Sequence, residues 1–157
     1  MPLFGRRRPP DPLGEGVWRR AHDRYHRAVD RAHQVLDGVP AGAAHDGLTD
    51  VANLLATLVG DVRAVCERAQ ADAPSSGVEV PGGSAGRYLD AHRALSRAGT
   101  MAAQAAEAAV LTRVALASGD AATADERVSA ARRAATASAE QVAVAGRLVA
   151  QDRPPVR

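Results

Sequence analysis

Apolar side chains recur at alternating steps of three and four along four separate stretches of the chain. Each stretch is bounded by Gly, Pro or a helix-capping residue. This spacing keeps side chains on one stripe of an α-helix, which packs against other helices. The pattern predicts one all-α domain, an up-down-up-down antiparallel four-helix bundle over 17–150 with disordered ends at 1–16 and 151–157. The predicted helices lie near 17–37, 47–72, 85–118 and 121–150.

The last two predicted helices form a long Ala-rich hairpin over 85–150, joined by Ser118-Gly119-Asp120. A turn this short makes the two helices antiparallel neighbours. Gly119 suits the left-handed position that ends a helix, and Asp120 can cap the next one. Thr123 opens a capping-box spacing with Glu126 and is a competing start. The predicted buried stripes are Tyr88, Ala91, Leu95, Ala98, Ala102, Ala105, Ala109, Thr112 and Leu116, then Val128, Ala131, Ala135, Ser138, Val142, Ala145 and Val149.

The first two predicted helices carry the larger core side chains. Trp18 and Tyr25 lie on the apolar stripe of 17–37, and we expect their polar atoms to reach the rim or a backbone partner. The helix at 47–72, which begins at Asp46 or Thr49, has the most hydrophobic stripe in the chain. Cys66 at the edge of that stripe is expected to be a small core residue rather than a reactive thiol.

The composition favours a cytoplasmic protein without a strong polyanion partner. The chain has 157 residues and a net charge of +2, its 20 basic residues are all Arg, and Lys and Ile are absent. A GC-rich genome explains this Arg bias without selection for phosphate binding. The single Cys cannot form an internal disulfide, and no apolar run reaches the length of about 20 residues that a membrane span needs. We therefore expect a location in the cytoplasm.

An Asp–His row follows the outer face of the first helix at steps of three and four: Asp23, His26, Asp30, His33 and Asp37. Metal sites in helical bundles use such spacing, but their ligands face the core. This row falls on the side opposite Trp18, where Asp–His pairs on one helix are an ordinary surface feature. We expect no metal, no cofactor and no catalytic residue there.

His92 lies in the segment Ala91-His92-Arg93-Ala94-Leu95-Ser96-Arg97-Ala98-Gly99. These nine residues resemble the phospho-accepting helix of histidine phosphotransfer domains, which are four-helix bundles. The resemblance implies phosphotransfer through His92. That family has Lys three residues and Gly four residues after the histidine, and this chain has Leu95 and Ser96 there. Arg93 and Arg97 are the cations near His92 in the sequence. Phosphotransfer signalling is thus an alternative function.

A second alternative is weak binding of nucleic acid or a membrane surface by the Arg-rich termini. Both ends of an up-down-up-down bundle emerge together, so the terminal arginines can form one basic patch, although acidic residues dilute it. The patch comprises Arg6, Arg7, Arg8, Arg153 and Arg157. The three neighbouring charges Arg6, Arg7 and Arg8, without a lipidation motif, give only transient attachment to an anionic surface. We expect neither a nucleic-acid partner nor stable membrane insertion.

The helix at 85–118 is predicted to be longer than both helices of the first hairpin, so its end projects beyond them. Val110, Leu111 and Val114 make this end apolar beyond its stripe, with Arg113 the only charge nearby. Such an end is expected to be covered. The loop Val39-Pro40-Ala41 can cover it. The favoured alternative is a symmetric homodimer in which Val110, Leu111 and Val114 form the interface. The function class that follows is a non-catalytic bundle that acts through contacts with a protein partner or with itself.

Overall fold

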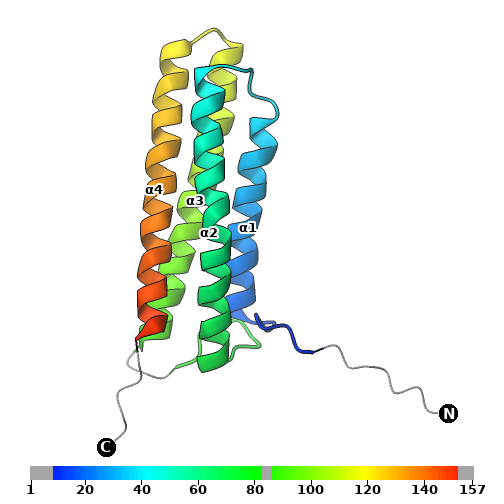
Figure 1. The fold of residues 1–157 in the computed structure, drawn as a ribbon, viewed down its shortest axis with the longest axis vertical. Coiled ribbons are helices and arrows are strands. Elements are labelled where there is room, and N and C mark those ends of the chain that lie inside the picture. The colour runs from blue at the N-terminus through cyan, green and yellow to red at the C-terminus, as the bar shows by residue number, and fades with distance from the viewer. Residues whose placement is uncertain (1–8, 83–85, 152–157) are drawn as a thin grey trace, which may run out of the picture.

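The computed structural model describes residues 9–82 and 86–151, and within them it contains helices and no strand. The helices are α1 at Val17–Leu36, α2 at Ala43–Asp72, α3 at Arg87–Ala117 and α4 at Ala121–Ala150 (Figure 1). The described chain enters α1 and leaves α4 at the same end of the bundle. The predicted all-α four-helix bundle is confirmed.

The helices follow the order α1, α2, α4, α3 around the bundle axis. α1 packs on α2 and α3, and α4 packs on the same two helices, whereas α2 and α3 lie across a diagonal and touch little (Figure 1). Since the chain direction reverses from each helix to the next, the partners within each hairpin are antiparallel. The neighbours from different hairpins, α1 with α3 and α2 with α4, run parallel.

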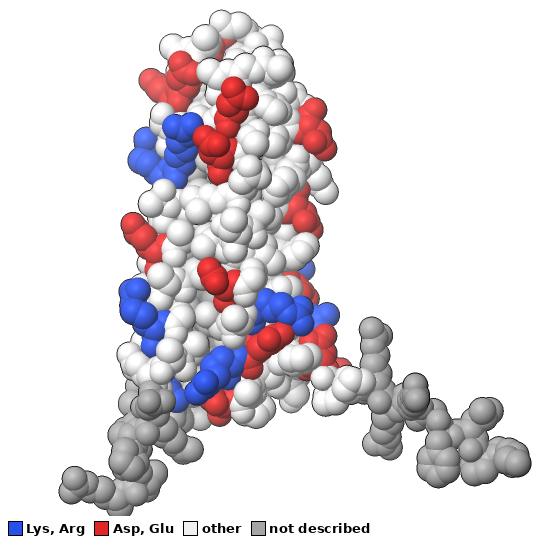
Figure 2. All heavy atoms as spheres, in the orientation of Figure 1, with Lys and Arg blue, Asp and Glu red and all other residues white. Residues whose placement is uncertain are grey.

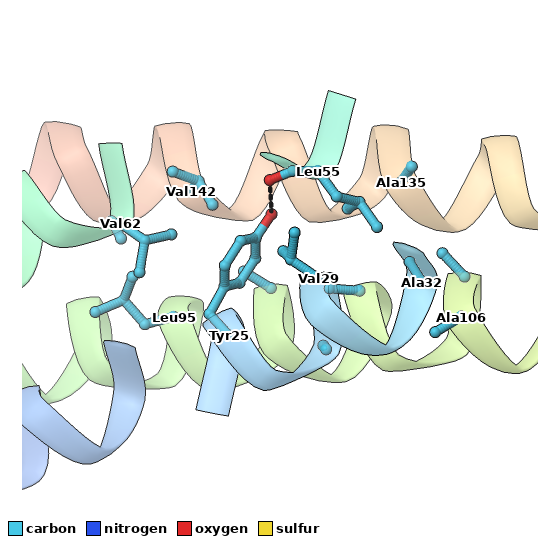
Figure 3. Close-up of a cluster of buried hydrophobic side chains, with 14 of the residues drawn as sticks. Tyr25, Val29, Ala32, Leu55, Val62, Leu95, Ala106, Ala135 and Val142 are labelled. Atoms are coloured by element: carbon cyan, nitrogen blue, oxygen red, sulfur yellow. Dashed lines mark hydrogen bonds between the residues drawn. The ribbon is translucent and has the colours of Figure 1, made fainter. Parts of the chain in front are cut away.

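The large side chains of the first hairpin lie in the core, as the sequence indicates. Trp18 and Tyr25 are almost fully buried, and Figure 3 shows Tyr25 pointing across to α2 among Val, Leu and Ala side chains. Its hydroxyl donates to the carbonyl oxygen of Leu55 at 3.4 Å. The indole N–H of Trp18 donates to the carbonyl oxygen of Ala73 at 2.9 Å. Both polar atoms thus have backbone partners, as expected.

The Ala-rich hairpin packs through the two predicted stripes. Every position of both stripes is buried except Leu116, which is half-buried. Small side chains let the backbones approach closely, and the buried Ser138 hydroxyl of α4 donates to the carbonyl oxygen of Ala98 in α3 at 2.9 Å. The core of this hairpin is therefore built mainly from small side chains, and Ser138 supplies a buried hydrogen bond between its two helices.

The turn between α3 and α4 forms a Schellman motif. Gly119 has φ +75°, and its N–H donates to Leu116 at 3.1 Å, while the N–H of Asp120 donates to Ala115 at 2.9 Å. These bonds satisfy carbonyls that the end of α3 would leave unpaired. The Asp120 carboxylate accepts from the N–H of Thr123 at 3.0 Å. Asp120 is therefore the cap of α4, and the competing start at Thr123 is wrong.

α2 begins at Ala43, earlier than the predicted Asp46 or Thr49, and no side chain caps it. Its first turns are held by packing instead: Ala44 and Gly47 are buried, and Gly47 lies against α4. α2 therefore has 30 residues against 31 for α3, whereas α1 has only 20. α3 is therefore much longer than α1, as predicted, but it exceeds α2 by a single residue, so the large difference in length predicted against α2 is wrong.

The residues just before α1 pack on the bundle. The sequence assigns all of 1–16 to a tail, but within the described part Leu13 is 2% exposed and belongs to the core. A turn positions it, since the N–H of Gly14 donates to the carbonyl oxygen of Asp11 at 2.8 Å. The Ser75 hydroxyl accepts from the N–H of Val17 at 3.2 Å and so satisfies the start of α1. The buried Leu13 and an ion pair between Asp11 and Arg19 therefore hold this segment against the bundle.

None of the four helices in the described ranges is long and apolar enough to cross a membrane.

Candidate interaction surfaces

The Asp–His row faces solvent, as predicted. His26, Asp30, His33 and Asp37 are exposed and Asp23 is half-buried. His26 pairs with Asp30 at 3.1 Å on the same helix. Nowhere in 9–82 or 86–151 do three or more His, Cys, Asp or Glu side chains gather closely enough to hold a metal ion. The row provides local surface pairs rather than converging ligands.

Cys66 is completely buried beside the backbone of His22. Burial raises the pKa of its thiol to about 12. At neutral pH the group is therefore a protonated core residue, which is a poor nucleophile. This agrees with its predicted role in packing. His22, which the sequence pattern does not single out, is also buried, and its ring Nδ1 lies 3.0 Å from the carboxylate of Asp23.

His92 lies at the edge of the core on α3. It is half-buried, and its ring packs edge-on against Trp18 with centroids 5.8 Å apart. Burial lowers the pKa of the imidazole, and the positive charges of Arg20 and Arg24 lower it further. Sequence reasoning named only Arg93 and Arg97 as neighbours, because the two arginines of α1 approach His92 only through the tertiary fold.

The three predicted interface residues near the end of α3 differ in their surroundings. Val110 is half-buried and packs against the core, whereas Leu111 is 39% exposed and Val114 is 57% exposed. Val39 in the connection between α1 and α2 is buried. That connection therefore contributes to the core but leaves Leu111 and Val114 open to solvent.

The predicted basic patch cannot be placed. Arg6, Arg7, Arg8, Arg153 and Arg157 all lie outside the described residues. On the face formed by α2 and α4, acidic and basic side chains are interspersed with wide neutral areas (Figure 2).

A groove between α1 and α3 has arginines on one wall, and sequence reasoning did not identify it. Its volume is about 460 Å³. The rim consists of Arg24, Arg27 and Arg31 from α1 and Glu107 from α3. The floor consists of Ala28, Gly99, Ala103, Ala106 and Val110. We call this surface the α1–α3 groove.

The arginines of the α1–α3 groove differ in their partners. Arg24 reaches across to α3 and donates to the Thr100 hydroxyl at 2.9 Å. Arg27 and Arg31 are exposed and form no hydrogen bond or ion pair with any residue that the structure describes. Glu107 is the only carboxylate among the lining residues. The groove therefore presents two unpaired guanidinium groups beside an apolar floor.

A signal for this wall is present in the sequence. Arg20, Arg24, Arg27 and Arg31 follow one another at steps of four, three and four, the same period as the apolar stripes. A general Arg bias conceals the pattern, and its meaning depends on which helix lies alongside.

Comparisons with known proteins give no match: no family model fits the chain, and neither a curated protein nor a solved structure is detectably similar. The case for a function therefore rests on the surfaces described above.

Proposed function

We propose that this chain is a non-catalytic helical bundle of the cytoplasm that acts through contacts with protein molecules, and that one such contact joins two copies at the end of α3. The observation that carries this proposal is the exposure of Leu111 and Val114, at 39% and 57%. These two aliphatic side chains lie three residues apart on one helix, so they form one small patch. Val110 continues the patch toward the core.

A symmetric dimer is the simplest cover for such a patch. In a two-fold interface the same residues meet on both subunits, so one apolar patch serves both sides. The titratable groups give less support to catalysis. The Cys66 thiol is buried with a pKa near 12, and the Asp–His row points to solvent.

Light scattering over a tenfold concentration range tests the dimer. We expect the mass to rise from monomer toward dimer, and Val114→Arg to keep the mass at that of the monomer. The matched control is Val78→Arg, because Val78 is 82% exposed and lies in the connection after α2, at the opposite end of the bundle from the α3–α4 turn (Figure 1). The control should dimerise like the parent. A monomer at every concentration would rule out self-association.

Phosphotransfer through His92 is a second candidate, favoured by the proximity of Arg20 and Arg24. These cations could balance the charge of a phosphoryl group, but the contact with Trp18 leaves the imidazole only half open. We therefore expect no phosphohistidine after incubation with acetyl phosphate and mass spectrometry under alkaline conditions. Phosphate on His92, absent from His92→Gln, would establish this candidate instead.

A further inference from the structure

We propose that the α1–α3 groove is a docking site for an acidic amphipathic helix of another protein. The apolar side of that helix lies on the small residues of the floor, and its carboxylates pair with Arg27 and Arg31. This surface is separate from the patch at Leu111 and Val114, so the proposal goes beyond the proposed self-association.

The shape of the groove suits a helix. Its walls are two parallel neighbouring helices, and the floor extends along α3 from Gly99 to Val110, about 16 Å at 1.5 Å per residue. Ala103 is exposed and Val110 is half-buried, so these two residues are the open part of the floor, whereas Gly99 and Ala106 are buried and the Arg24 side chain lies over Gly99. Recognition in which an amphipathic helix lays its apolar face in a groove is a common mode of protein binding. The length corresponds to about three turns of a bound helix.

The positive charge of the groove indicates that its partner is negatively charged. Three arginines face one carboxylate, and two of the arginines have no partner within 9–82 and 86–151. Arg27 and Arg31 are four residues apart, one helical turn, so they match carboxylates spaced by one turn on the opposing helix. Arg24 is already bonded to Thr100 and holds the wall in place.

A second copy of this chain is a less suitable occupant. Exposed carboxylates lie on all four helices, and α2 carries Asp46, Asp50 and Asp61, of which Asp50 already pairs with Arg132 at 3.5 Å. The only large apolar side chain exposed on that helix is Leu54, at 37%, and one leucine does not fill the floor. Such a contact would also join different surfaces of the two copies, and head-to-tail contacts of this kind need not close into a dimer. The observations therefore favour a different protein.

The test uses a labelled synthetic peptide of about 20 residues, a length that can hold an isolated helix. It carries Ala and Leu on one face and Glu at one-turn spacing beside them. A matched peptide has Gln at each Glu position. Fluorescence anisotropy with the full-length chain, at low salt and at about 0.15 M salt, measures the affinity of each peptide. The chain is used with Val114→Arg, so that failure of the proposed dimer and failure of this inference are distinguishable.

We expect the Glu peptide to bind and the Gln peptide to bind about tenfold more weakly. An exposed ion pair changes an equilibrium constant by up to about fivefold, so loss of two pairs by Arg27→Gln with Arg31→Gln should weaken binding about tenfold. The matched control is Arg133→Gln with Arg147→Gln, which makes the same charge change on exposed positions of α4. The control should bind the Glu peptide within about twofold of the parent.

A variant that leaves the charge of the chain unchanged tests the floor of the α1–α3 groove. Ala103 is exposed, so Ala103→Trp should leave the helix content and thermal unfolding unchanged while filling the groove. We expect it to weaken binding of the Glu peptide at least as much as the arginine variant does. No binding of the Glu peptide, equal binding of the Gln peptide, or full binding by Ala103→Trp would each overturn the proposal.

Two further outcomes would reassign the surface. Binding to phosphatidylserine vesicles that requires Arg27 and Arg31, without binding of the Glu peptide, would make the groove a lipid-headgroup site. Self-association that requires the same two arginines, again without peptide binding, would make the partner a second copy. Either result overturns the proposed occupant.

Discussion

At the scale of single residues, two glycines inside α2 have opposite surroundings. Gly47 is buried where α2 meets α4, and a Cβ there would lie 2.7 Å from a methyl carbon of Val128. Gly60 is exposed, and a Cβ there would meet nothing within 4 Å. The same substitution therefore changes stability in opposite directions at the two positions.

Gly60→Ala should raise the free energy of unfolding by about 0.5–1 kcal/mol, because Ala loses less backbone entropy in a helix. Gly47→Ala should lower it by about 1–3 kcal/mol, because the added methyl overpacks a tight contact. Urea unfolding followed by circular dichroism measures both. Equal stabilisation by the two variants would show that α2 does not pack closely on α4 at Gly47.

The thiol of Cys66 should make the fold sensitive to alkaline pH. Burial raises its pKa from 9.0 to about 12, so in this range the folded state keeps a proton that the unfolded state loses. The stabilisation is fully present below pH 9.0 and is lost as pH rises toward 12, with a slope of up to about 1.4 kcal/mol per pH unit. The chain contains no lysine, so few other groups titrate there.

Urea unfolding at about pH 8 and pH 10 measures this loss of stability. Cys66→Ala should remove most of the dependence of the free energy of unfolding on pH in this range. Tyr25 leaves a smaller residual slope, because burial raises the pKa of its hydroxyl as well. If Cys66→Ala keeps the full slope of the parent, the thiol is not the group responsible.

At the scale of elements, the start of α1 depends on a residue far away in the chain. Gly16 precedes α1 and offers no side chain, and the free N–H of Val17 is satisfied by the Ser75 hydroxyl. Ser75 is 5% exposed, and its hydroxyl also lies 3.2 Å from the carbonyl oxygen of Glu79. The segment after α2 therefore caps α1 from outside.

Ser75→Ala should lower the free energy of unfolding by about 1–2 kcal/mol, comparable to loss of a helix cap. Ser76→Ala is the matched control, since Ser76 is exposed and should be neutral within about 0.5 kcal/mol. Chemical denaturation of both variants provides the comparison. A neutral Ser75→Ala would mean that water satisfies the start of α1 equally well.

At the scale of the whole molecule, the sequence predicts what each helix buries but not how the helices are ordered around the axis. The stripes through Trp18, Leu55, Ala98 and Val142 are readable, because burial imposes a helical period. The spacing of apolar residues does not predict that α1 lies beside α3. The arginine wall of the groove could therefore not be recognised from the sequence. The start of α2 was missed for a related reason, since tertiary packing at Gly47 replaces a side-chain cap.

The molecule as a whole should bind DNA and anionic vesicles only weakly. The net charge is +2, and several arginines are held in ion pairs, including Arg19 with Asp11 and Arg63 with Glu67. Few phosphates can then be neutralised, and binding should weaken steeply with salt. Fluorescence titration at low salt and at about 0.2 M salt measures this dependence. Submicromolar affinity at the higher salt would show a stronger basic cluster than the described residues contain.

The diagonal placement of α2 and α3, which are consecutive in the chain but hardly touch, has a consequence for the order in which the helices pack. The two helices of each hairpin are joined by a short connection. α1 and α3 are separated in the chain by the whole of α2, so contact between them closes a much longer loop. Closing a longer loop costs more chain entropy, and local contacts form faster than distant ones. The α3–α4 hairpin, with its very short turn, is therefore expected to form early, and docking of α1 onto α3 is expected to be a late event. The α1–α3 groove would then be completed only in that last step.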